Sequence, residues 1–409
     1  ISNRSNKESL IADLMDNSKP MRPGFEPLEG KQAALFSKIE LDKFIEEEAK
    51  HDIKILSSHT SQSLQTFSSG ERKKALFGHL LKTKPEFLIL DNPFDNLDVE
   101  AQEEFAEMFE DLSGRIPLVQ LTGRRNDLLP FVQQFGILVN TSVRWYDSKE
   151  EFLKDLSDHK SPFNAQIPPP PEFPDYNEQY LIQLKEVDVS YGSKKVLDKI
   201  NWNIKPGEFW ELAGKNGSGK TTILSMITGD NPKGYGQELY LFGTKKGSGE
   251  SIWDIKKKIG YFTPAMIDRF RGYHSLENML ISGLLDSIGL YVIPSEAQIR
   301  LARKWLALVN MEDLKDAYFH ELTIGQQRLI MCVRAMIKHP LLLILDEPTA
   351  GLDDASAALI VSLVNKMAEE SHTTIVFVSH RKEPGLQPAF IYRLRMGPDG
   401  SIGETKAKL

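Results

Sequence analysis

A repeated pattern governs how this chain can fold. The stretch LLKTKPEFLILDNPFDNLDVE at residues 80–100 returns as AMIKHPLLLILDEPTAGLDDA at residues 335–355. Asp91 and Asp346 are 255 positions apart, and so are Gly70 in FSSGERK and Gly325 in TIGQQRL. Two separate motifs with one common offset indicate a duplication. We therefore predict two copies of one module in tandem.

Each copy alternates short apolar runs with stretches of helical spacing. The runs at 87–90 and 341–345 end at an acidic residue, which is typical of a buried strand with a carboxylate at its end. The runs at 117–121 and 374–378 form a second such pair, and residues 99–112 and 355–370 have helical spacing. This alternation predicts the α/β class, with a mostly parallel sheet flanked by helices and ligands at the carboxyl ends of its strands.

Composition excludes several classes of protein. The 409 residues include 41% hydrophobic residues, so we expect a packed core rather than a disordered chain. Cys332 is the one cysteine, which excludes an internal disulfide and a cysteine-rich zinc site. The formal net charge of −7 argues against a nonspecific nucleic-acid binder. No apolar run is long enough to span a bilayer and no secretory signal opens the sequence, so we expect a cytoplasmic protein.

Prolines mark the boundary between the two copies. Residues 161–174 hold six of them: Pro162, Pro168, Pro169, Pro170, Pro171 and Pro174. Such a segment lacks amide donors and favours an extended form. We therefore expect a domain at 1–160, a linker at 161–176 and a second domain at 177–409. The alternative is that the segment is a proline-rich ligand for another protein.

The second half contains a phosphate-binding loop. Residues 214–221 (GKNGSGKT) fit the pattern G-x-x-x-x-G-K-[ST], and they lie between an apolar strand at 209–213 and a helical run at 222–228. In this pattern the backbone amides face phosphate oxygens, the lysine reaches the β- and γ-phosphates, and the threonine faces Mg²⁺. The candidate nucleotide-binding residues are Gly214, Asn216, Gly217, Ser218, Gly219, Lys220, Thr221 and Thr222.

Acidic and basic groups follow the strands of the same half. Asp346 ends the strand at 341–345 and is a candidate for holding Mg²⁺, together with Thr221. Glu347 is the candidate base that takes a proton from the attacking water. His380 follows the strand at 374–378, where its side chain could reach the γ-phosphate. A structural or surface histidine is the alternative.

These residues resemble the ATP-binding-cassette ATPases over about 180–395. Leu322 to Arg328 (LTIGQQR) is similar to the family signature L-S-G-G-Q-Q-R, with Thr323 and Ile324 as departures. Residues 229–260, with the tandem layout, resemble the ModF-type branch, whose members are also labelled photorepair or molybdate-transport ATP-binding proteins. The resemblance implies two P-loop NTPase modules, each with a helical subdomain, the first module being degenerate or incomplete.

The resemblance also implies how the halves cooperate. In this family two cassettes pair head to tail, and each ATP lies between the P-loop of one and the signature of the other. We therefore expect the two domains to pair intramolecularly, with Ser68, Gly70 and Glu71 completing the site of the second P-loop. The family places an aromatic residue on adenine, and Tyr191 is the candidate, with an ordinary core tyrosine as the alternative.

The sequence predicts that the other composite site is damaged. It would contain Lys7, Asp91, Asn92 and Gly123 of the first half, with the signature residues Thr323, Gly325 and Gln326. Lys7 aligns with Lys220. Arg4 and Asn6 replace the glycines of this loop, and Glu8 replaces Thr221. Asn92 stands where Glu347 stands and cannot take a proton, and Gly123 replaces His380. We expect weak nucleotide binding, structural binding or none. The alternative is a compact site with unusual residues that still works.

Two further departures concern length and coupling. Lys220 and Gly325 are 105 positions apart, whereas Lys7 and Gly70 are 63 apart, so the first half is eroded or incomplete between these motifs. It also lacks strands ahead of its P-loop. After the strand near 259–262 the family usually has a glutamine, which is absent from GYFTPA at 260–265. Coupling to a partner could therefore differ from that of ordinary transporters.

Three functions fit this pattern. The first is an ATPase with ATP and Mg²⁺ as ligands that drives a transport system through a separate membrane permease, at the inner face of the cell membrane. The second is a nucleic-acid-linked ATPase, suggested by the photorepair label, although the sequence has no strong nucleic-acid signal. The third is an ATP-gated scaffold, against which the complete set of Lys220, Glu347 and His380 argues.

Overall fold

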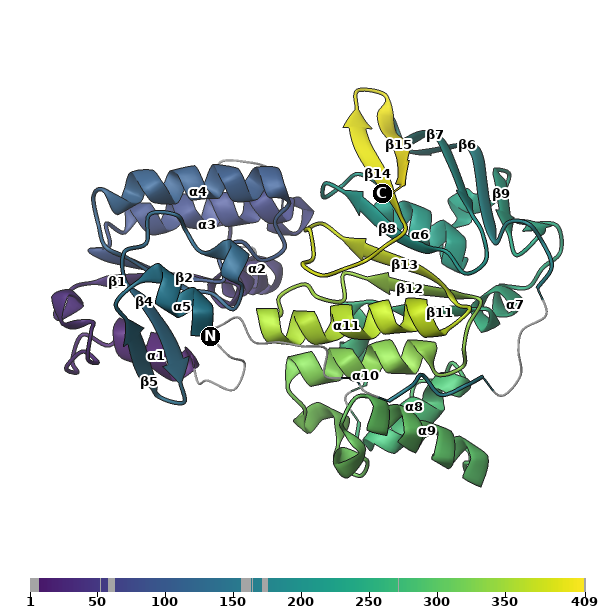
Figure 1. The fold of residues 1–409 in the computed structure, drawn as a ribbon. Coiled ribbons are helices and arrows are strands. Elements are labelled where there is room, and N and C mark those ends of the chain that lie inside the picture. The colour runs from purple at the N-terminus through teal and green to yellow at the C-terminus, as the bar shows by residue number, and fades with distance from the viewer. Residues whose placement is uncertain are drawn as a thin grey trace. The chain divides into compact units, whose positions relative to one another are not determined.

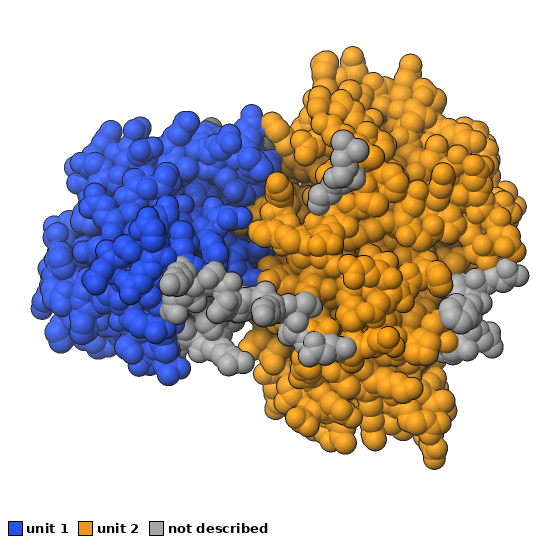
Figure 2. Space-filling model, in the orientation of Figure 1, with its two compact units in different colours: residues 1–159, 351–355 blue, residues 160–350, 356–409 orange. Residues whose placement is uncertain are grey.

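The computed structural model describes residues 7–51, 53–57, 63–155, 163, 165–170, 176–270 and 272–407. The chain divides into two compact units, residues 1–159 with 351–355 (unit 1) and residues 160–350 with 356–409 (unit 2), which Figures 1 and 2 show as ribbon and surface. Pro162, Pro171 and Pro174 of the expected linker, and Arg4 and Asn6 of the first P-loop, lie outside the described residues. The domain limits given above stay a prediction.

Unit 1 is a small α/β unit. Its described residues form a parallel sheet in the order β1-β2-β3 and a separate antiparallel hairpin of β4 and β5. The strands are β1 (Ala33–Phe36), β2 (Phe87–Asp91), β3 (Leu118–Leu121), β4 (Phe135–Val139) and β5 (Ser142–Tyr146). The helices are α1 (Lys7–Met15), α2 (Lys38–His51), α3 (Ser69–Lys82), α4 (Val99–Ser113) and α5 (Lys149–Asp155).

Aromatic side chains form the centre of unit 1. Phe36 of β1, Phe77 of α3, and Phe105 and Phe109 of α4 are all at most 3% exposed. The ring centroid of Phe109 lies 5.7 Å from that of Phe36 and 5.5 Å from that of Phe77, both in edge-to-face geometry. Such pairs stabilise a core beyond their buried area. This cluster therefore fixes α3 and α4 to one face of the sheet.

Unit 2 is built on one large sheet. Within the described residues its strands follow the order β10-β9-β6-β7-β15-β14-β8-β13-β12-β11. The strands are β6 (Ile182–Tyr191), β7 (Lys194–Ile204), β8 (Phe209–Gly214), β9 (Glu238–Leu241), β10 (Thr244–Lys245), β11 (Ile259–Phe262), β12 (Leu342–Asp346), β13 (Thr374–Ser379), β14 (Phe390–Gly397) and β15 (Gly400–Ala407). The run from β11 to β14 is parallel, and the pairs β6–β7, β6–β9, β9–β10 and β14–β15 are antiparallel.

The parallel part of this sheet positions the site. Asp346 at the end of β12 is in register with Val378 of β13, and Ser379 is in register with Ala213 of β8. The carboxyl ends of all three strands therefore meet at one edge, where ligands bind in open α/β sheets. The apolar runs of β12 and β13 are fully buried except at Asp346.

Helices cover the sheet of unit 2 and form a helical subdomain (Figure 1). They are α6 (Lys220–Thr228), α7 (Ile252–Lys257), α8 (Leu276–Leu284), α9 (Glu296–Leu308), α10 (Ile324–Met336) and α11 (Asp354–Glu370). Helix α8 packs against both α9 and α10. No helix among the described residues combines the length and the apolar character needed to cross a membrane.

The structure confirms the secondary structure expected around the motifs. The apolar runs at 87–90 and 341–345 are strands β2 and β12, and those at 117–121 and 374–378 are β3 and β13. The helical spacing at 99–112 and 355–370 corresponds to α4 and α11. The bounds differ by one or two residues, because helix and strand ends depend on local capping rather than on the apolar pattern.

Replacing Phe109 by alanine should destabilise unit 1 selectively. The lost packing at the aromatic cluster should lower its free energy of unfolding by about 3–5 kcal/mol. Hydrogen exchange read peptide by peptide in urea would measure this, with Val99→Ala on the exposed side of α4 as the control. An equal loss of protection in β12 and β13 would contradict two separately packed units.

Candidate functional site

The loop between β8 and α6 has the backbone that the P-loop pattern predicts. Gly219 ends the loop with φ +93°, a left-handed conformation that favours glycine. A Cβ at Gly219 would also lie 2.5 Å from Cδ2 of Leu197. Any larger residue would therefore have both an unfavourable backbone conformation and a steric clash with Leu197. This explains why the pattern needs glycine directly before Lys220.

The start of α6 is prepared for an anion. Gly219 caps the helix without a side-chain hydrogen bond, so the first amides of α6 keep their donor capacity. Nζ of Lys220 donates to the carbonyl oxygens of Gly214, at 2.6 Å, and Lys215, at 3.1 Å. Thr221 is exposed and Thr222 is half-buried in the first turn. The positive end of the α6 dipole and the ammonium of Lys220 therefore both favour an anion bound in the loop.

Ser218 gives an independent sign that this loop holds a polar ligand. Its side chain is fully buried, yet Oγ has no hydrogen-bond partner among the described residues. A buried hydroxyl without a partner costs free energy and calls for an explanation. Phosphate oxygens in the loop would satisfy it, so the residues fit a nucleotide.

Asp346 is a half-buried carboxylate at the end of β12. Burial, reinforced by the neighbouring carboxylate of Glu347, raises the pKa of Asp346 to about 6, although Lys220 opposes the shift. The hydroxyl of Tyr261 on β11 lies 3.4 Å from Oδ2 of Asp346. A divalent cation would relieve this unfavourable burial, so Asp346 and Thr221 fit the oxygen ligands that Mg²⁺ prefers.

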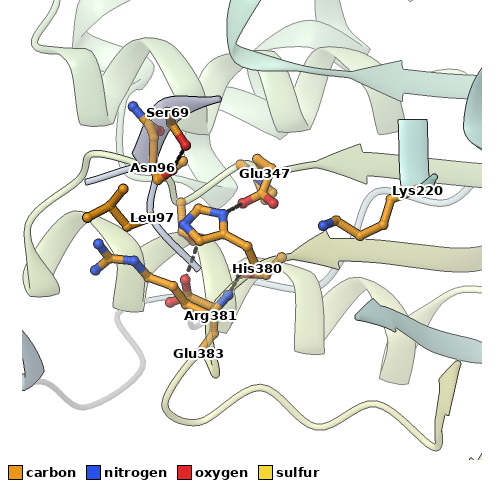
Figure 3. Close-up of polar contacts among 12 residues, drawn as sticks. Ser69, Asn96, Leu97, Lys220, Glu347, His380, Arg381 and Glu383 are labelled. Carbon is orange, nitrogen blue, oxygen red and sulfur yellow. Dashed lines mark hydrogen bonds and ion pairs between the residues drawn. The ribbon is translucent and has the colours of Figure 1, made fainter. Parts of the chain in front are cut away.

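Glu347 and His380 form a hydrogen-bonded pair (Figure 3). Nδ1 of His380 lies 2.7 Å from Oε2 of Glu347, and the side chains are 5% and 22% exposed. Nε2 of His380 is buried and has no partner among the described residues. Figure 3 shows the ammonium of Lys220 directed toward this pair. The arrangement provides a carboxylate, an imidazole that orients it, and a ring nitrogen left for a ligand.

Tyr191 lies at the end of β6, where the candidate adenine platform was expected. Its ring is 46% exposed. The hydroxyl accepts a hydrogen bond of 2.8 Å from Nδ2 of Asn231, and Nζ of Lys233 lies 5.8 Å from the ring centroid. Tyr191 is thus a surface residue whose hydroxyl is fixed by a hydrogen bond, rather than a core residue. Its stacking on adenine stays a prediction.

The two signature motifs adopt the same local structure in their own units. Ser68 caps α3: its Oγ accepts from the backbone N–H of Glu71 at 3.2 Å, and the Glu71 carboxylate accepts from the N–H of Ser68 at 2.7 Å. That backbone hydrogen bond lowers the pKa of Glu71. Thr323 and Gln326 repeat this capping box at the start of α10. Gly70 and Gly325 both lie in the first turn of their helix.

Unit 1 brings the residues of the degenerate site together and satisfies them internally. Nζ of Lys7 lies 2.9 Å and 3.2 Å from the two carboxylate oxygens of Asp91. Nδ2 of Asn92 donates to Oδ1 of Asp91 at 3.2 Å, and Oδ1 of Asn92 accepts from the N–H of Gly123 at 3.3 Å. The lysine that would face phosphate is therefore neutralised by the aspartate that would hold a cation.

Backbone conformation shows how the two copies correspond. Asn92 and Glu347 both have positive φ, at 45° and 54°. Each donates its N–H to the neighbouring strand, Asn92 to the carbonyl of Leu121 and Glu347 to that of Val378. The left-handed position is therefore retained while its side chain has changed from a carboxylate to an amide.

Sequence reasoning missed Tyr261. Sequence analysis noted only that the segment 260–265 lacks a glutamine. Within that segment it is Tyr261, the next-to-last residue of β11, whose side chain reaches Asp346. Burial raises the pKa of Tyr261 well above its ordinary value, so its hydroxyl remains a donor. Finding this contact requires the register of β11 with β12, and the periodicity of the sequence does not give that register.

Several known proteins are similar to this chain. Residues 197–350 match the family described as "ABC transporter". The chain is 40% identical to the ABC transporter ATP-binding protein ModF of Escherichia coli, over 82% of this chain and 70% of that protein. It is 30% identical to an ABC transporter ATP-binding protein of Schizosaccharomyces pombe, over 80% and 68%. Among solved structures, cbiO1 of Clostridium perfringens matches at 25% identity and a TM-score of 0.48, over 56% and 89%.

The chain therefore belongs to the ATP-binding-cassette family, and it is a P-loop ATPase. Within that family the expected resemblance to the ModF-type branch is confirmed. The predicted fold class, α/β with P-loop NTPase modules in tandem, is confirmed as well.

Replacing Asp346 by asparagine should stabilise the protein without nucleotide or Mg²⁺ at pH 8. The folded pKa of about 6 lies above the ordinary aspartate pKa of 3.8, so the contribution of Asp346 to stability falls as pH rises from about 4 to about 6 and stays low above that. We expect a gain on the order of 2 kcal/mol at pH 8 that disappears below about pH 4.

Urea unfolding across this pH range in EDTA measures the effect. Asp399→Asn, at an exposed carboxylate, is the matched control and should show no comparable gain. A gain for Asp346→Asn that is equal at pH 4 and pH 8 would show that burial of the charged form is not its cause.

Proposed function

We propose that this ATPase hydrolyses ATP at one composite site, formed by the P-loop of the second domain and the signature of the first. The observation that carries the proposal is the pair of Glu347 and His380 beside the P-loop, in contrast with Asn92 and Gly123 at the matching positions. Only one of the two copies has retained groups that can take a proton and contact the γ-phosphate.

The second domain would bind the triphosphate. The loop amides, the start of α6 and Lys220 would bind the phosphate oxygens, and the buried hydroxyl of Ser218 would gain a partner. Thr221 and Asp346 would hold Mg²⁺, which when bound neutralises charge on the β- and γ-phosphate oxygens. Tyr191 would stack on the adenine.

Glu347 would serve as the base for the attacking water. Its carboxylate is held by Nδ1 of His380, which limits its rotation and leaves Nε2 for a γ-phosphate oxygen. Proton transfer to Glu347 and in-line attack of the water would then occur with both groups already positioned.

The first domain would complete the site from its own helix start. Ser68 caps α3, and Gly70 and Glu71 lie in its first turn; the amides of this turn and the capping hydroxyl suit a γ-phosphate. The other composite site, with Thr323, Gly325 and Gln326, would remain structural, because Lys7 is already paired with Asp91. Intramolecular pairing of the domains on ATP would be the mechanical output.

We further propose that this output drives transport through a separate membrane permease, with the chain at the inner face of the membrane. The support is the description of the relatives as ABC transporter ATP-binding proteins. The rate of ATP hydrolysis by the purified chain should therefore rise when membranes that contain its permease are added. Stimulation by DNA or RNA instead would favour a nucleic-acid-linked ATPase, and no stimulation by either would favour a scaffold.

Glu347→Gln should bind ATP normally and lose at least about a hundredfold in turnover, because the amide cannot accept the proton. Asn92→Gln is the matched control, since it changes the corresponding position of the other copy, and its turnover should stay within about twofold. Steady-state phosphate release and binding of a fluorescent ATP analogue measure the two quantities. Unchanged turnover in Glu347→Gln would end the assignment of the base.

Ser68→Ala should lower turnover far more than Thr323→Ala. Both substitutions remove the capping hydroxyl of a capping box and should cost a similar ~1 kcal/mol of helix stability. Only Ser68 is assigned to the active composite site. We therefore expect turnover to fall by about tenfold or more in Ser68→Ala and by less than about threefold in Thr323→Ala. Equal effects in steady-state assays would contradict the proposed asymmetry.

A further inference from the structure

A second side-chain hydrogen bond joins the two loops of unit 2 that carry Glu347 and His380. Oγ1 of Thr349, in the loop after β12, donates to Oε1 of Glu383, in the loop after β13, at 2.7 Å. The two residues are 0% and 6% exposed. Figure 3 shows Glu383 in the same loop as His380. A carboxylate is rarely buried to this extent, so we asked what the contact does.

The internal repeat provides a second copy of both loops for comparison. In unit 2 the N–H of Arg381 donates to Oγ of Ser379 at 3.0 Å, directly after β13. In unit 1 the N–H of Arg124 donates to Oγ1 of Thr122 at 3.2 Å, directly after β3. The two loops therefore begin with the same hydrogen bond and correspond residue by residue from there.

The backbone of the other loop is held in the same way in both copies. Arg328 of α10 donates to the carbonyl oxygens of the two residues that flank Thr349. Lys73 of α3 donates to those of the two residues that flank Phe94, at 2.7 Å and 2.8 Å. Phe94 thus occupies the place of Thr349. Because this clamp is present in both copies, the shape of the loop does not depend on the hydroxyl of Thr349.

Unit 1 has replaced both partners of the contact. Phe94, at the place of Thr349, is 5% exposed, and its ring centroid lies 6.2 Å from that of Phe109 in the aromatic core. Asn126, at the place of Glu383, is exposed. A phenyl ring cannot donate a hydrogen bond to a carboxylate. The copy that lacks the candidate base and its histidine therefore lacks this contact as well.

We propose that Thr349 and Glu383 are positioning residues, whose hydrogen bond holds the loop after β12 against the loop after β13 and so keeps Glu347 and His380 in bonding geometry. The backbone of Glu347 has φ +54°, which is unfavourable for a residue with a side chain and has to be imposed by its surroundings. This inference rests on the proposed function, because it takes Glu347 as the base.

The contact acts next to two other bonds between the same loops. The N–H of Glu347 donates to the carbonyl of Val378, and the Glu347 carboxylate bonds to His380. Without the bond from Thr349, the catalytic pair would itself have to hold the loops together. A displacement of about 1 Å can cost up to about a hundredfold in rate. Binding of ATP depends on the P-loop instead and should change little.

Thr349→Val is the main test, because valine has nearly the shape of threonine but no hydroxyl. We expect kcat to fall by about tenfold or more, while the affinity for ATP stays within about twofold. Thr349→Ser keeps the donor and should have a kcat within about threefold of the wild type. Steady-state phosphate release and binding of a fluorescent ATP analogue measure the two quantities in the full chain.

Thr374→Val is the matched control for the loss of a buried hydroxyl. Thr374 is fully buried at the amino end of β13, and its Oγ1 accepts from the N–H of Gly207 at 2.9 Å. Both valine variants should lower the urea midpoint by similar amounts, but the kcat of Thr374→Val should stay within about twofold of the wild type. Equal losses of kcat in the two variants would overturn the proposal.

A His380→Ala background shows whether the contact acts through the catalytic pair. There the pair is already broken, so adding Thr349→Val should change the single-turnover rate of ATP hydrolysis by less than about twofold. A further tenfold loss in that background would overturn the positioning role, since it would show an effect independent of the pair.

Glu347→Gln, measured in the same assay, separates this inference from the proposed function. If Glu347→Gln loses turnover while Thr349→Val stays within about twofold of the wild type, the positioning role is wrong and the assignment of the base stands. If Glu347→Gln keeps its turnover, the proposed function is wrong and this inference is wrong with it.

Discussion

Parallel pairing of β8, β13 and β12 is the constraint on which the chemistry of this chain depends. Because the three strands are in register and end at one edge, the P-loop, the Asp346–Glu347 step and His380 come from segments far apart in the sequence and still meet. The fully buried strand interiors fix that register. This packing holds the unfavourable features of the site in place: a half-buried carboxylate, and two buried polar atoms that have no partner within the described part of the chain.

The same scaffold supports opposite outcomes in the two copies. Unit 1 retains the strand, the left-handed residue after it and the capped signature helix, but its polar groups bond to one another. Among the described residues of unit 2, Nε2 of His380 and Oγ of Ser218 have no hydrogen-bond partner. In the function proposed above, the changes at Asn92 and Gly123 leave the first copy to contribute a signature and the second copy to contribute the catalytic groups.

Much of this organisation could be predicted from the sequence, for physical reasons. The repeat, the P-loop and the acidic strand are local patterns in which residue type dictates backbone, and the structure has the expected strands and helices there. The contacts of Tyr261 with Asp346 and of Thr349 with Glu383 depend on strand order and register instead. Lys7 begins α1 as Lys220 begins α6. Its ion pair with Asp91 could not be predicted from the sequence, because it depends on how α1 and β2 are placed in space.

The number of ATP molecules that one chain binds tests the account most directly. Native mass spectrometry of Glu347→Gln with ATP and Mg²⁺ should show one nucleotide per chain, lost when Lys220→Ala is added and retained when Lys7→Ala is added. Two nucleotides per chain, or one that depends on Lys7 rather than Lys220, would contradict the assignment of a single competent site to the second P-loop.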